Sequence, residues 1–86
     1  MKIVFSSRFV KEYRNLSKSI QILTDKQLRF LAIDFRHPSL RVKKVQGVDA
    51  IFEGRVTRSY RFTFHFEEDA LVLRRVGEHD KTLKNP

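Results

Sequence analysis

Phenylalanine at every second position of one segment constrains the fold of this chain most strongly. In residues 60–67, YRFTFHFE, three phenylalanines alternate with polar residues. This period of two predicts a β-strand with one buried face and one polar face. Residues 67–69, EED, then predict a turn, and residues 71–76, LVLRRV, predict a returning strand. The two strands therefore form an antiparallel hairpin within the stretch 55–79.

A two-residue loop at Glu68 and Asp69 fixes the register of this hairpin. The expected pairs are then Phe66 with Leu71, Phe64 with Leu73, and Arg61 with Val76. Basic side chains gather near the open end of the hairpin and on its polar surface: Arg58, Arg61, Arg74 and His79. Cationic groups above an apolar sheet face predict a phosphate-binding site, and RNA is the expected substrate.

Length and composition limit the possible classes of protein. A chain of 86 residues is expected to form one domain, 1–86. The absence of cysteine excludes disulfides, thiolate zinc sites and a cysteine nucleophile. Because no signal peptide is recognisable and no apolar run approaches roughly 20 residues, we expect a cytoplasmic protein without a membrane span. The formal net charge of +8 favours a polyanion or an acidic protein partner, although a basic surface can also serve solubility alone.

The first half of the chain predicts a strand and two helices. Residues 2–6 are expected to form the strand, and Ser6 or Ser7 is expected to cap a helix that runs through Asn15 or beyond. An apolar stripe follows this helix at helical spacing: Phe9, Tyr13, Leu16 and Ile20. The sequence TDKQ at 24–27 is a capping-box pattern, so a second helix is expected to begin at Asp25.

The second helix is expected to end at His37-Pro38, because the residue before proline is disfavoured in helical geometry. Its expected buried face consists of Leu28, Leu31, Ala32 and Phe35. Strands are expected at 41–45 and 51–58, separated by a break at 47–49, before the hairpin. This order predicts an α+β fold with the helical hairpin on one face of a small, mostly antiparallel sheet. The opposite face, with Arg61, Thr63 and Arg74, is expected to stay open.

Three segments carry a resemblance to a known family. They are SLRVKKVQG at 39–47, RVTRSYRFTF at 55–64 and VGEHDKTLKNP at 76–86, and the last two are the more specific. In this order the chain resembles the RelE/ParE superfamily of toxin–antitoxin toxins over nearly its whole length, and within it the RelE-type mRNA interferases. The resemblance implies a β-α-α-β-β-β fold and a cytosolic ribonuclease that cuts mRNA, often in the ribosomal A site. It also implies inhibition by an acidic antitoxin and activity without metal or cofactor.

The resemblance assigns roles to individual residues. Arg61 falls on the strand arginine that holds the scissile phosphate, and Arg55 on a second basic position. His79 falls where several branches place a catalytic histidine, and Lys43 and Lys44 lie in the region of the catalytic lysines of RelE. The chain departs from the family in ending without a tyrosine, and no carboxylate stands clearly at the position of one branch's glutamate base.

Cleavage of RNA without a metal needs a base near the 2′-OH, positive charge at the phosphate and an acid at the 5′-oxygen. We assign His79 as the general acid or base and Asp80 as the group that orients its ring, with Arg61 as the phosphate clamp. Lys43 or Lys44 stabilises charge or acts as base. The residues expected to bind RNA around this centre are Arg55, Arg58, Arg74 and Tyr60.

Plainer interpretations remain for several of these residues. Tyr60 is more often a packed strand residue than a stacking platform, and lysines such as Lys43 and Lys44 often protect an edge strand. Three histidines this far apart have no metal-ligand spacing, so a zinc site is not expected. Two other functions also stay open: a ParE-like toxin that inhibits DNA gyrase without nuclease chemistry, and a non-catalytic nucleic-acid-binding relative.

Overall fold

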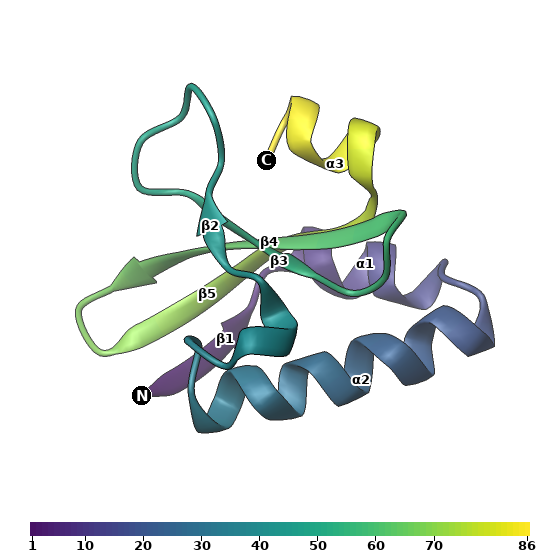
Figure 1. The fold of residues 1–86 in the computed structure, drawn as a ribbon, viewed down its shortest axis with the longest axis horizontal. Helices are drawn as coiled ribbons and strands as arrows, with labels where there is room; N and C mark the ends of the chain where they lie inside the picture. Colours follow the sequence, from purple (N-terminus) through teal and green to yellow (C-terminus); the bar gives the residue numbers. More distant parts are fainter.

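A five-stranded mixed sheet organises the molecule. The computed structural model describes residues 1–86. The elements in chain order are β1 (Lys2–Phe5), α1 (Ser7–Arg14), α2 (Lys18–Ile33), the 3-10 turn η1 (Pro38–Leu40), β2 (Lys43–Lys44), β3 (Phe52–Arg55), β4 (Tyr60–Glu67), β5 (Ala70–Glu78) and α3 (His79–Lys84). The strand order is β1-β5-β4-β3-β2, with β1 parallel to β5 and the other neighbours antiparallel (Figure 1). The expected α+β class is confirmed. No helix combines the length and apolar character needed to cross a membrane.

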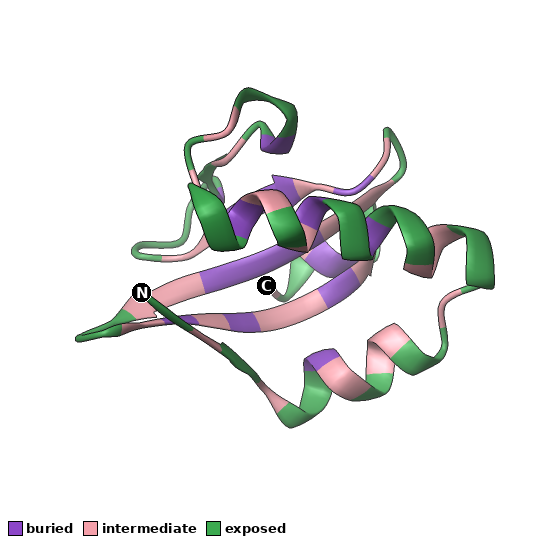
Figure 2. Cartoon of the chain, turned by 90° about the horizontal axis from the view of Figure 1, so that it is seen from below, coloured by how far each residue is buried: buried purple, intermediate pink, exposed green.

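The apolar core lies between this sheet and the first two helices. Phe62 and Phe64 of β4 are completely buried beside Leu73 and Val76 of β5, as the period of two predicts. Phe9 of α1 and Leu31 of α2 belong to the same cluster. Figure 2 shows the buried positions along the strands and on the helices that cover them. Both helices therefore pack on one face of the sheet.

A β-bulge changes the register of the hairpin partway along β4. The expected pairs of Phe66 with Leu71 and of Phe64 with Leu73 are confirmed, but Arg61 pairs with Gly77 instead of Val76. The shift lies between Thr63 and Phe64, where Arg74 is the extra residue of β5. Because of this extra residue, the apolar side chains at 73 and 76 both reach the core despite their odd spacing.

The boundaries of the two helices differ from those expected. The first helix ends at Arg14, and the second begins at Lys18 with Ser17 as its N-cap. The prediction of a start at Asp25 is wrong, because Thr24 lies inside α2 and its hydroxyl donates a 2.8 Å hydrogen bond to the Ile20 carbonyl. A threonine whose hydroxyl donates to a carbonyl in the preceding turn of its own helix can be mistaken in the sequence for an N-cap.

Gln27, the other half of the apparent capping box, fastens α2 to the sheet. Its buried side-chain amide donates to the carbonyls of Ser39, at 3.0 Å, and of Arg55, at 2.7 Å. The helix ends at Ile33, earlier than His37-Pro38, and Ala32 is exposed. The strands after it are also shorter than expected, since β2 spans two residues and β3 spans four.

Over β4 and β5, the face of the sheet opposite α1 and α2 is covered by α3 and the residues after it, so the prediction of an open face at Thr63 and Arg74 is wrong. Figure 1 shows α3 on the far side of the sheet from α2. Thr63 is completely buried there, and its hydroxyl donates to the Pro86 carbonyl at 3.0 Å. Arg74 Nε donates to the same oxygen at 3.1 Å. Residues 79–84 form this helix, which the sequence analysis did not predict.

Candidate functional site

A basic groove forms where the turn between β3 and β4 meets the start of α3. We call it the arginine groove. Its volume is about 690 Å³, and no apolar residue lines it. The lining residues are Arg55, Arg58, Ser59, Arg61, Glu78, His79, Asp80 and Lys81. Five of the residues predicted for the site therefore lie together, among them Arg61 and His79.

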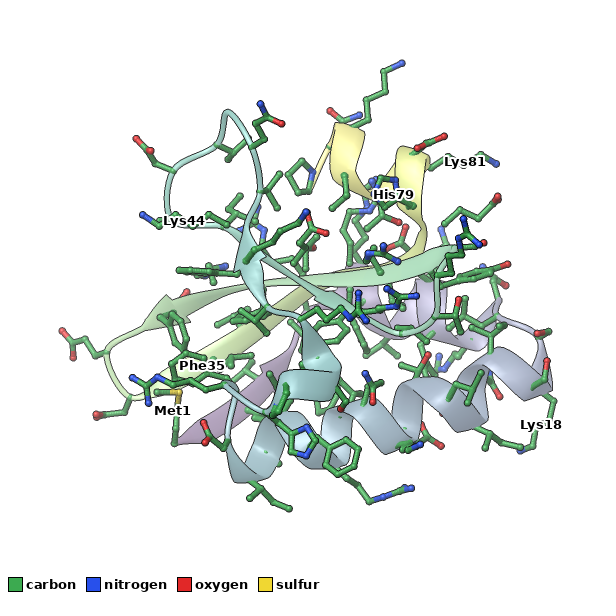
Figure 3. All side chains as sticks on the ribbon, viewed as in Figure 1. Met1, Lys18, Phe35, Lys44, His79 and Lys81 are labelled. Atoms are coloured by element: carbon green, nitrogen blue, oxygen red, sulfur yellow. The ribbon has the colours of Figure 1, made fainter.

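The start of α3 places His79 in this groove. The His79 amide donates to the Ser59 carbonyl at 2.8 Å, which ties the helix to the β3–β4 turn. In the side chain, Nδ1 lies 3.0 Å from Oδ1 of Asp80. The imidazole is about half exposed and the Asp80 carboxylate fully so. Figure 3 shows His79 and Lys81 together on α3. Nδ1 is thus occupied by Asp80, and Nε2 is the ring nitrogen available to a substrate.

Most of the Arg61 guanidinium is committed to the protein itself. Nη1 donates to three carbonyls of the turn: Thr57 at 2.6 Å, Arg58 at 2.9 Å and Tyr60 at 3.1 Å. Nε lies 3.5 Å from Oε1 of Glu53. Only Nη2 is left without a contact inside the chain, so Arg61, the predicted phosphate clamp, has one amino group for a ligand.

The arginines around the groove repel one another. The pKa of Arg55 is lowered, first by desolvation and then by the positive charges of Arg41, Arg61 and Arg58. Guanidinium groups this close are stabilised by a bound anion, because the anion offsets their mutual repulsion. The electrostatics of the groove therefore favour a phosphate.

A second hollow of about 460 Å³, which we call the lysine groove, adjoins the first. Its lining residues are Lys43, Lys44, Val45, Gln46, Glu53, His79 and Leu83. His79 lines both grooves and lies between them. The two predicted lysines and the predicted histidine are thus brought together.

Glu53 is the residue of this site that the sequence analysis missed. Its carboxylate is buried on β3, paired with Arg61 and opposite Lys43 in the β2–β3 ladder. The signal was present, because a glutamate two residues before Arg55 on a strand shares a face with it. In the sequence, no carboxylate stood clearly at the position of one branch's glutamate base, and Glu53 was not considered for that role.

Two predicted binding residues lie outside both grooves. Tyr60 packs against the apolar core. Arg74 contacts Pro86 and places Nη1 2.9 Å from Nδ1 of His65. No group of three or more His, Asp or Glu side chains is arranged to hold a metal ion.

Solved structures of bacterial and archaeal toxins share the fold of this protein over nearly the whole chain. A YoeB/ParE toxin from Agrobacterium tumefaciens has a TM-score of 0.77 at 14% identity, covering 92% of this chain and 99% of the toxin. The chain has the RelE/ParE toxin fold. A RelB-RelE antitoxin-toxin complex from Methanococcus jannaschii gives 0.74 at 19% identity, with 91% and 92% covered. The DinJ-YafQ toxin-antitoxin complex of E. coli gives 0.71 at 19%, with 93% of each chain covered.

No protein-family model and no curated protein sequence matches the chain. The RelE/ParE fold predicted from the three sequence segments is nevertheless confirmed by these structures. Since one fold serves several activities, the function has to be argued from the two grooves.

Proposed function

We propose that this protein is the toxin of a toxin–antitoxin pair and that it cleaves mRNA in the cytoplasm, on the ribosome. The observation that carries the proposal is the position of His79 between a groove of arginines and a groove that holds two lysines and a carboxylate. A proton-transfer group beside clustered positive charge is what cleavage of a phosphodiester through its own 2′-OH requires.

The proposed reaction uses side chains of this chain alone. Glu53 accepts the proton of the 2′-OH, and the oxygen attacks the adjacent phosphorus. As the bond from phosphorus to the 5′-oxygen breaks, His79 delivers a proton from Nε2 to that leaving oxygen. The products are a 2′,3′-cyclic phosphate and a 5′-OH. In this step Glu53 takes up one proton and His79 releases one. Asp80, at Nδ1, holds the imidazole in the orientation for this transfer.

Cationic groups stabilise the charge that develops on the phosphorane. Nη2 of Arg61 contacts the scissile phosphate, and Arg55 and Arg58 hold it and its neighbour. On the other side of His79, Lys43 and Lys44 contact the ribose–phosphate chain. Arg61 also acts through Glu53, because their ion pair fixes the carboxylate.

The proposed protein partner is an acidic antitoxin. The net charge of +8 favours an acidic segment across the two grooves. Two of the structures that share the fold are complexes of a toxin with an antitoxin, RelB-RelE and DinJ-YafQ. Tight self-association without any acidic partner would count against this part of the proposal.

Expression of the chain alone tests the proposed function. The wild type should arrest growth and create new 5′ ends in cellular transcripts, and His79→Ala should do neither while keeping the same circular dichroism spectrum. Lys18→Gln is the matched control, because Lys18 is exposed at the start of α2, away from both grooves (Figure 3). If no new 5′ ends arise, the nuclease proposal is wrong.

A ParE-like inhibitor of DNA gyrase is the second candidate, because one of the structures with this fold is a YoeB/ParE toxin. A binder has no need of a proton-transfer group between two cationic grooves. Inhibition of gyrase supercoiling by the His79→Ala protein would therefore favour this function over RNA cleavage.

A further inference from the structure

A third hollow lies at the other side of β2 and belongs to neither groove. We call it the aromatic pocket. Its volume is about 470 Å³. The lining residues are Phe35, Arg36, His37, Pro38, Arg41, Val42, Lys43 and Phe52. Three cationic side chains and three aromatic rings thus surround one space, and no acidic residue is among them.

Flat groups are already stacked around this pocket. The His37 ring lies parallel to that of Phe30, with centroids 4.0 Å apart and an angle of 14° between the planes. The Arg36 guanidinium lies over the ring of Phe35, 4.7 Å from its centroid. Both Phe35 and His37 are partly exposed. Guanidinium planes and aromatic rings are the platforms on which unpaired bases stack.

The aromatic pocket adjoins the lysine groove. Lys43 lines both this pocket and the lysine groove. Arg41, at its edge, is near enough to Arg55 for their charges to interact. Arg41 is also held in the left-handed region, with φ of 48°, directly after η1. Arg41 thus adds a cation to the aromatic pocket, and its charge also acts on Arg55 in the arginine groove.

We propose that the aromatic pocket binds an unpaired nucleobase of the same RNA strand, beside the cleaved bond, with Arg41 and Lys43 on the connecting phosphates. This inference rests on the proposed function and adds a subsite to it. The base stacks on the Arg36–Phe35 pair or takes the place of the guanidinium. An acidic peptide would be attracted by the same charges but would leave the aromatic platforms unused.

Binding of uncleavable RNA tests the subsite. The probes are 2′-O-methylated uridine oligomers of about 4 to 16 nucleotides, the range that small single-strand-binding domains occupy. Each oligomer carries one terminal 4-thiouridine for photo-cross-linking. Phe35→Leu removes the ring but keeps an apolar side chain, and Arg41→Asn keeps a residue that tolerates the left-handed conformation. Phe5→Leu is the matched control, because Phe5 is half exposed on β1 and lines none of the three hollows.

The proposal expects Phe35→Leu to weaken binding of the longer oligomers by about fivefold or more, as the loss of one stacked base does. The shortest oligomers and the Phe5→Leu control should stay within about twofold of the wild type. Cross-links should map to residues 35–43. The subsite is refuted if the wild type binds and cleaves RNA while Phe35→Leu and Arg41→Asn both bind long oligomers as it does. A folded wild type that binds no RNA refutes the proposed function itself.

Discussion

Removing the side chain of Arg61 is predicted to destabilise the fold in addition to abolishing activity. One nitrogen of this residue holds three carbonyls of the β3–β4 turn, and another pairs with Glu53. In Arg61→Ala the turn loses these donors, and a buried carboxylate is left without its partner. Loss of toxicity in this variant would therefore not distinguish the loss of a phosphate contact from the loss of fold stability.

The size of the effect follows from the burial of the pair. Side-chain exposure is 14% for Arg61 and 7% for Glu53, and the atoms are 3.5 Å apart. Breaking a buried pair by removing one partner costs about 3–5 kcal/mol, and at this separation and at the rim of a groove we take the lower end, about 3 kcal/mol. For a chain of 86 residues, the expected free energy of unfolding is about 4–13 kcal/mol. The substitution thus removes roughly a quarter or more of the total.

Urea unfolding followed by circular dichroism measures this loss. The double variant with Arg61→Ala and Glu53→Gln should be more stable than Arg61→Ala alone, because the glutamine leaves no unpaired charge. Arg58→Ala is the matched control: Arg58 is exposed, so its removal should change stability by less than about 0.5 kcal/mol. An Arg61→Ala protein as stable as this control would refute the reasoning.

Three further outcomes are expected. Gly54→Ala should cost about 1–3 kcal/mol in urea unfolding, because the added methyl would overlap the buried ring of Phe62. Tyr13→Phe should cost at most about 1 kcal/mol at neutral pH. The pKa of Tyr13 is raised above 10.0 by its hydrogen bond to Asp25, then by burial and by the charge of Asp25, so this stabilisation is complete below the ordinary value and is lost as pH rises through the raised pKa. Unfolding curves of the two proteins should therefore converge in alkali. RNA binding should weaken with salt by about 0.7 logarithmic units per decade for each phosphate contacted, and Arg58→Gln should lower that slope by about one contact.

The sheet and its core were predictable from the sequence because their signals are local. Alternating phenylalanines define β4, and the apolar residues at 71, 73 and 76 define the buried side of β5. The spacing of three residues between the apolar Leu73 and Val76 also indicates the bulge, but the hairpin register was predicted from a strict period of two.

Features that depend on tertiary contacts were not predictable in this way. Thr24 and Gln27 look like a cap, but their hydrogen-bond partners inside α2 and on the sheet are visible only in the fold. The helix at 79–84 has few apolar residues, yet it packs over Thr63. This packing is why the expected open face is covered.

For the site, the sequence identified the basic residues and the histidine but not their division into two grooves. That division places Glu53 in the lining of the lysine groove, which shares His79 with the arginine groove. It also leaves Arg74 and Tyr60 outside. Whether a side chain lines a groove depends on its position relative to the bulge and to α3. A strict period of two in the sequence predicts neither the bulge nor the packing of α3.

The chemistry of the RNA ends tests the central claim most directly. Purified protein is incubated with ribosomes and mRNA, and the termini of the fragments are analysed. The account predicts a 2′,3′-cyclic phosphate and a 5′-OH, no cutting where the ribose before the bond is 2′-deoxy, and a rate about 10²- to 10⁴-fold lower for His79→Ala. Fragments with a 5′-phosphate, or cutting that persists at the 2′-deoxy position, would contradict it.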